Sequence, residues 1–99
     1  MIRHIVLIRF KPEADFAAIF AALPELSGRL PGVLHFASGR SASPEQIERG
    51  YMHGFTIDFA DWAALATYQA DAGPKAFGGA LAANAVGGIE GILVFDLVV

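Results

Sequence analysis

The chain has no cysteine, no cluster of basic side chains and no long apolar run among its 99 residues. Without cysteine it has neither disulfides nor thiol chemistry, and a reducing compartment is allowed. No stretch approaches the roughly 18–20 apolar residues of a membrane span, and no signal-peptide pattern is present. The net charge of −3 argues against nucleic acid as a partner, and nothing resembles a helix that binds a membrane surface. A soluble cytoplasmic protein is therefore expected.

Apolar residues, in contrast, are abundant. They make up 55% of the chain, which is high for what its length predicts to be a single domain spanning residues 1–99. A chain of this size buries roughly 65% of the surface that its unfolded form exposes. Surplus apolar surface is often covered by a partner subunit.

Four stretches alternate side chains with the period of two that is typical of β-strands. They are residues 1–10, 33–40, 51–59 and 91–99. The first and the last are apolar on both faces, and such strands need cover on both sides of the sheet.

The segments between the strands have helix signals. Asp15 and Asp61 each precede an Ala-rich stretch and can cap a helix N-terminus. Pro24 interrupts the first helical region, which predicts either a kink or a break with the proline opening a second short helix. Pro74 stands where it can open a further helix at its first position.

The predicted order is β-α-β-β-α-β. Right-handed crossovers then give a four-stranded antiparallel sheet with its helices on one face, which is the ferredoxin-like α+β fold. The third strand is expected beside the first. The first and last strands are expected to take one central and one edge position.

The face without helices presents an apolar patch in this arrangement. Burying its four large side chains is worth roughly 6–12 kcal/mol before the costs of association. A two-fold homodimer through the sheets is therefore predicted, and the alternative is a monomer whose patch binds something else. The patch consists of Ile5, Leu7, Leu93 and Phe95.

Four segments, in this order and spacing, resemble the Dabb family, the stress-responsive dimeric α/β-barrel domains. The segments are MIRHIVLIRFK, RGYMHGFTIDF, YQADAGPKAF and GILVFDLVV. The likeness covers essentially the whole chain. It implies a ferredoxin-like fold, and two sheets that form a barrel at a dimer interface.

One branch of that family, typified by a plant olivetolic acid cyclase, closes linear polyketides without a cofactor. Its pocket between sheet and helices has polar positions matched here by His4, His53 and Tyr68. The branch's His-Pro-x-His segment is replaced here by residues 71–74, Asp-Ala-Gly-Pro, and a tyrosine of its first helix by Leu23. The general base of the cyclase scheme is thereby lost.

The polar residues allow two interpretations. His4 and His53, on neighbouring strands, can move a proton near neutral pH, or each can be a hydrogen-bonded core histidine. Tyr68 can meet a ligand through its hydroxyl. Only His35 or Asp71 could complete a metal site with the two histidines, so no metal is expected.

The leading hypothesis is a protein that binds a small apolar or aromatic ligand between sheet and helices, or that is purely structural, without an established reaction or a cofactor. The alternative is a cofactor-free polyketide cyclase-like or monooxygenase-like enzyme. In that case His4 and His53 would act as acid and base, and Tyr68 would orient a carbonyl. The apolar residues expected to line the cavity are Val6, Ile8, Phe20, Phe36, Phe55, Phe77, Ile92 and Val94.

Overall fold

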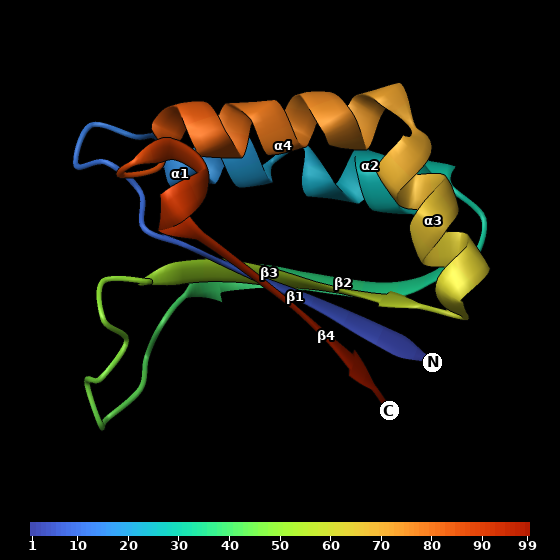
Figure 1. The fold of residues 1–99 in the computed structure, drawn as a ribbon, viewed down its shortest axis with the longest axis horizontal. Helices are drawn as coiled ribbons and strands as arrows, with labels where there is room; N and C mark the ends of the chain where they lie inside the picture. The colour runs from blue at the N-terminus through green and yellow to red at the C-terminus, as the bar shows by residue number, and fades with distance from the viewer.

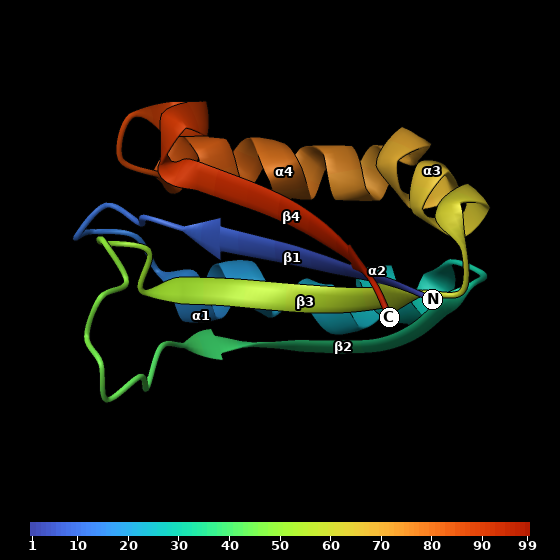
Figure 2. The ribbon, with the colours of Figure 1, turned by 60° about the horizontal axis from the view of Figure 1, so that its bottom comes forward.

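The computed structural model describes all 99 residues. Its centre is a four-stranded sheet of β1 (Ile2–Ile8), β2 (Val33–Arg40), β3 (His53–Phe59) and β4 (Ile92–Val98). The strand order is β2-β3-β1-β4, and every neighbouring pair is antiparallel (Figure 2). The predicted ferredoxin-like fold is confirmed, with β3 beside a central β1 and β4 at the edge.

The helices all lie on one side of this sheet (Figure 1). They are α1 (Phe16–Phe20), α2 (Leu23–Arg29), α3 (Trp62–Ala70) and α4 (Ala72–Asn84), and a short 3-10 turn, η1 (Gly88–Gly91), leads into β4. The helices α1 and α2 lie on the side of β2 and β3, whereas α4 lies on the side of β1 and β4 (Figure 2). We call the helix side of the sheet its covered face and the other side its open face.

Aspartates start three of the helices. The Asp15 carboxylate accepts a hydrogen bond from the Ala18 amide at 3.1 Å, and Asp61 accepts one from Ala64 at 2.9 Å. Both caps were predicted, because a capping carboxylate satisfies an amide that has no partner within the helix. Asp71 caps α4 in the same way and also accepts a hydrogen bond from Arg29 of α2 at 2.6 Å.

Two prolines lie in the first turns of helices α2 and α4. Pro24 is the second residue of α2, so the chain breaks there into two short helices. Pro74 is the third residue of α4 instead of the predicted first, because Asp71 caps the helix earlier. Both prolines lie in a first turn, where the missing N–H would have no partner within the helix.

Three strands are shorter than the sequence pattern predicted, β4 by only one residue at each end. β1 ends at Ile8 instead of residue 10, and Phe10 makes only an isolated bridge with Ala85. β3 begins at His53 instead of residue 51. Its start is delayed by a turn in which Gly50 has a positive φ of 92° and the Met52 amide bonds to the Gly50 carbonyl.

The covered face contains the hydrophobic core. Alternate residues of β1 and β3 point into it and meet the apolar sides of the helices. The largest side chains without measurable exposure are Phe59, Ile8, Leu23 and Ile57.

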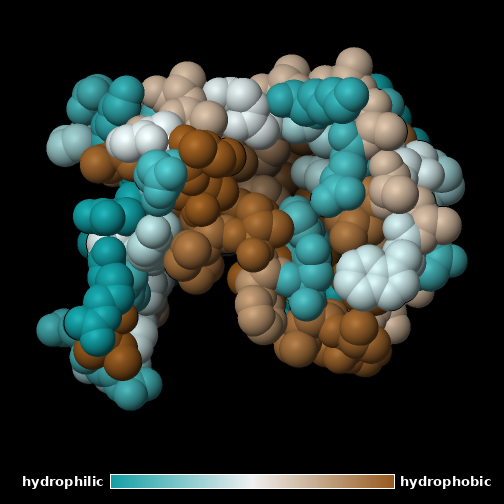
Figure 3. All heavy atoms as spheres, in the orientation of Figure 1, coloured by the Kyte–Doolittle hydropathy of each residue, from teal (hydrophilic) through white to brown (hydrophobic).

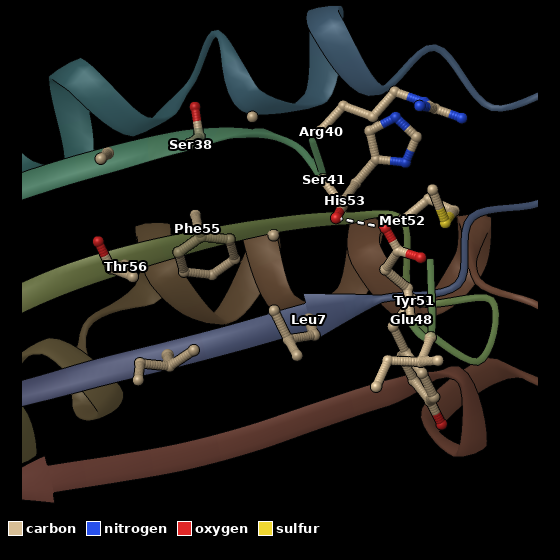
Figure 4. A pocket seen from close by; sticks show the side chains of 15 residues that line it. Leu7, Ser38, Arg40, Ser41, Glu48, Tyr51, Met52, His53, Phe55 and Thr56 are labelled. Carbon is tan, nitrogen blue, oxygen red and sulfur yellow. Dashed lines mark hydrogen bonds between the residues drawn. The ribbon is translucent and has the colours of Figure 1, made fainter. Parts of the chain in front are cut away.

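The open face is uncovered, and its β1–β4 part is mostly apolar. Leu93 and Phe95 on β4 are 47% and 60% exposed, and hydrophobic residues gather below the sheet (Figure 3). Residues 41–52, which we call the arm, extend beyond the sheet on this side (Figures 1 and 3). An open hollow of about 550 Å³ lies between the arm and the sheet, where the Ser41 hydroxyl donates to Glu48 at 2.5 Å (Figure 4).

Candidate functional site

A cavity of about 330 Å³ lies on the covered face, between β1 and β4 below and α3 and α4 above. Because β4 is the edge strand, the cavity opens to solvent there. Its walls are mostly apolar, with a few polar groups, a mixture typical of small-molecule sites. The lining residues are His4, Val6, Phe55, Tyr68, Gln69, Pro74, Lys75, Phe77, Gly78, Leu81, Ile89, Ile92 and Val94.

His4 is held by a carboxylate of the neighbouring strand. It is directly opposite Asp96 in the β1–β4 register, and its Nδ1 lies 2.6 Å from Asp96 Oδ1. A carboxylate can only accept, so Nδ1 carries the proton and donates it to this bond. When the ring is neutral, Nε2 therefore has its lone pair available, and the hydrogen bond fixes both tautomer and ring orientation.

Tyr68 of α3 stands beside this dyad. Its ring centroid is 6.3 Å from that of His4, in an edge-to-face arrangement, and its ring also packs on Phe59. Burial raises the pKa of Tyr68 to about 12, so the phenol stays protonated at neutral pH. Tyr68 can therefore donate a hydrogen bond to a ligand but cannot act as a base.

Lys75 and Gln69 are the polar residues in the outer part of the cavity. Both are exposed residues of the helices, and both contribute to the lining. Lys75 is the only cationic side chain there, because the other polar lining residues are His4, Tyr68 and Gln69. The inner wall therefore provides the acid–base groups, and the outer wall provides a positive charge.

His53 lies at the other end of the covered face. His4 pairs with Ile57 across the β1–β3 register, whereas His53 pairs with Ile8. This offset of four residues corresponds to about 13 Å along a strand. The structure therefore does not bring His4 and His53 together, although they lie on adjacent strands and on the same face.

Five of the eight apolar residues expected to line the cavity do so, namely Val6, Phe55, Phe77, Ile92 and Val94. Three do not. Ile8 is fully buried in the core, Phe20 packs edge-to-face on Phe10 and Phe55, and Phe36 packs against the core from β2. Phe20 on α1 and Phe36 on β2 lie in the β2–β3 half of the covered face, so facing the core did not place them at the cavity.

Asp96 was not predicted as a partner of His4. The signal was present, because Asp96 shares its strand parity with Ile92 and Val94. The strand pattern does not give the register between β1 and β4, and it is this register that places Asp96 opposite His4. The linkage could not be read from the strand pattern alone.

The structure contains no group of three or more His, Cys, Asp or Glu side chains that could hold a metal ion. His35 is exposed on β2, and Asp71 is engaged in capping α4 and binding Arg29. None of the helices has the length and apolar character needed to cross a membrane.

Solved structures with the same fold include proteins of known and unknown activity. A dimeric ferredoxin-like protein of unknown function from Jannaschia sp. CCS1 is 35% identical, with a TM-score of 0.92 over 99% of this chain and 98% of that one. Hydroxynitrile lyase from Passiflora edulis is 20% identical, with a TM-score of 0.84 over 99% and 92%. SnoaB, a cofactor-independent oxygenase from Streptomyces nogalater, is 16% identical, with a TM-score of 0.74 over 99% and 91%.

Among curated proteins no significant match was found. The family model of the stress-responsive A/B barrel domain matches residues 2–99, and the resemblance in the four sequence segments is thereby confirmed. The chain belongs to the Dabb family.

Proposed function

We propose that the protein binds a small, mostly apolar carbonyl compound in the His4 cavity and moves a proton on it without a cofactor. The observation that carries this proposal is the His4–Asp96 dyad on one wall of the cavity, with the protonated phenol of Tyr68 beside it. A base oriented by a carboxylate and a neutral hydrogen-bond donor are the two groups needed to remove a proton next to a carbonyl.

Each group has a defined role in this chemistry. The Tyr68 hydroxyl donates to the carbonyl oxygen, and the Nε2 lone pair of His4 takes the proton from the adjacent carbon. The electron pair of the broken C–H bond moves to the carbonyl and forms an enolate, which Tyr68 stabilises. The Asp96 carboxylate stabilises the imidazolium, and returning the proton from Nε2 restores the carbonyl compound.

This proposal replaces the predicted His4–His53 pair with His4–Asp96, because the two histidines are four register positions apart. Proteins of this fold include a lyase and a cofactor-independent oxygenase, which supports catalysis as a use of the fold. Binding without turnover is the second candidate, favoured by the mostly apolar walls. A cytoplasmic location is part of the proposal and is supported by the absence of cysteine.

Acetophenone in D₂O tests the reaction, because its methyl protons lie next to a carbonyl and their exchange for deuterium is visible by NMR. The protein should accelerate this exchange, and His4→Ala should slow the catalysed rate at least ~100-fold, the usual contribution of a positioned base. His35→Ala is the matched control, since His35 is exposed on β2 away from the cavity.

Exchange no faster with the native protein than with His4→Ala would exclude the proton transfer. Binding is measured separately, from amide shifts of the cavity residues during the same titration. Saturable shifts without exchange would support binding and exclude the proton transfer. The absence of both would reject the cavity as a site for such compounds.

We also propose that two copies pack through their open faces as a two-fold homodimer. The Jannaschia relative, at 35% identity, is described as dimeric. In this chain the apolar side chains of β1 and β4 surround a shallow hollow of about 330 Å³ on that face, into which a second copy can fit. Its lining residues are Ile5, Leu7, Leu93, Val94 and Phe95.

Leu7→Asp tests the dimer. It would place two carboxylates in an apolar interface, and the dissociation constant should rise at least ~100-fold. Light scattering at micromolar concentration should then give a monomer mass. Ala66→Asp on the exposed side of α3 adds the same charge elsewhere and should leave the dimer intact. A native protein that is itself monomeric under these conditions would rule out the proposed interface.

A further inference from the structure

The His53 end of the covered face contains a second, smaller hollow of about 210 Å³. It forms where the chain leaves β1, where β2 ends at Arg40 and where β3 begins at His53. Its lining includes the rings of Phe10 and Phe16 and the cations Lys11 and Arg40. It shares no lining residue with the His4 cavity.

His53 is held between aromatic rings. Its ring centroid lies 4.0 Å from that of Phe16, at an interplanar angle of 37°, and 5.5 Å from that of Phe10 in an edge-to-face arrangement. Its Nε2 atom is buried and has no hydrogen-bond partner in the protein. An unpaired buried polar atom is costly and rare in folded proteins, and it needs an explanation.

The charge of this hollow is positive. Arg40 and His53 are register partners on β2 and β3, and Figure 4 shows their side chains next to each other, directed away from Leu7 and the open face. No carboxylate lines the hollow, and Arg40 forms no ion pair. Lys11 also lines the hollow, but its ammonium donates to the Ala83 carbonyl at 3.1 Å, and Ala83 lies outside the lining.

One acid lies near this hollow without lining it. Glu48 of the arm is close enough to Arg40 to interact with it electrostatically. The Glu48 carboxylate accepts a hydrogen bond from the Ser41 hydroxyl, and Glu48 lines the separate hollow between the arm and the sheet. Arg40, which has no ion pair, and a histidine with an unpartnered buried nitrogen therefore line the same hollow, together with aromatic side chains.

We propose that this hollow binds a small aromatic carboxylate. The carboxylate lies against Arg40 and accepts a hydrogen bond from the Nε2–H of His53, which satisfies the buried atom. The ring of the ligand packs on Phe16. Aromatic surface and charge-assisted hydrogen bonds each contribute to such recognition. The proposal is independent of any chemistry at His4.

Benzoate is the probe, and the imidazole Hε1 signals of the three histidines are the readout. Titration should move the His53 signal saturably, while those of His4 and His35 stay in place. Arg40→Gln should weaken binding about tenfold, the loss expected for one charge-assisted hydrogen bond. Arg49→Gln removes an equal charge from the arm outside the lining and should change the affinity less than twofold.

His53→Phe provides a second variant, because it keeps the ring and removes the donor. The amide signals of Gly50 and Met52, which line the hollow, should no longer respond to benzoate. Equal affinity for inorganic phosphate would overturn the aromatic ligand class. An unmoved His53 signal at millimolar benzoate, or equal losses in Arg40→Gln and Arg49→Gln, would overturn the site.

Discussion

His4 and His53 lie on adjacent strands and on the same face of one sheet, yet they have opposite surroundings. His4 donates to a carboxylate and faces a cavity. His53 is next to a guanidinium, lies between phenyl rings and has a buried nitrogen without a partner. Burial first, and then Arg40, lowers the pKa of His53 below its usual value.

The difference shows that position along a strand decides what a histidine can do. A shift of four residues exchanges a carboxylate for a cation and an open cavity for an aromatic stack. In the functions that we propose, His4 therefore acts as a base, whereas His53 acts as a donor to an anion. Three predictions follow this contrast.

The largest effect is expected when the partnered histidine is removed. His4→Phe keeps the volume but leaves the Asp96 carboxylate, only 26% exposed, without its donor. The free energy of unfolding should fall by about 2 kcal/mol, the scale of a hydrogen bond to a charged group. Urea denaturation measures it. A loss below about 0.5 kcal/mol would mean that the 2.6 Å contact contributes little to stability.

The same substitution at the other histidine should act in the opposite direction. His53→Phe removes the unpaired Nε2 and places a phenyl ring against Phe16 and Phe10. The protein should become more stable by up to ~1 kcal/mol, because no buried polar atom is left unsatisfied. Urea denaturation of both variants in one buffer gives the contrast directly. Equal destabilisation by the two substitutions would remove the distinction drawn between them.

The smallest effect concerns pH. The pKa of His53 is lower in the folded protein than in the unfolded chain, where histidine titrates near ~6.5. As the pH falls below that value, the unfolded chain takes up a proton first, so stability is lost. Arg40→Gln should raise the pKa of His53 towards its usual value, as measured by NMR titration, and reduce this loss. An unchanged pKa would contradict the role of Arg40.

Much of the fold could be predicted, because its signals are local. Strand alternation, the capping aspartates Asp15 and Asp61, and the interruption at Pro24 all act within a few residues. The errors are also local. The β3 start depended on a turn at Gly50, and the α4 start depended on a cap at Asp71, which a prediction centred on Pro74 overlooked.

The candidate site was predicted less completely, because it depends on register and on helix placement. Face parity correctly put Val6 and Val94 on the same side as His4. It could not show that Asp96 is opposite His4, or that His53 is displaced along the sheet. It also could not assign Phe20 to the other half of the covered face, since that depends on where α1 docks.

The His4–Asp96 contact has a consequence for the order of events during folding. Its two residues are 92 positions apart, so forming the contact closes a very long loop of the chain. Contacts of such long range form late, whereas the β2–β3 pairing is more local. A folding chain can therefore have helices and a partial sheet before it has the dyad. The proposed chemistry would begin only when β4 has paired with β1.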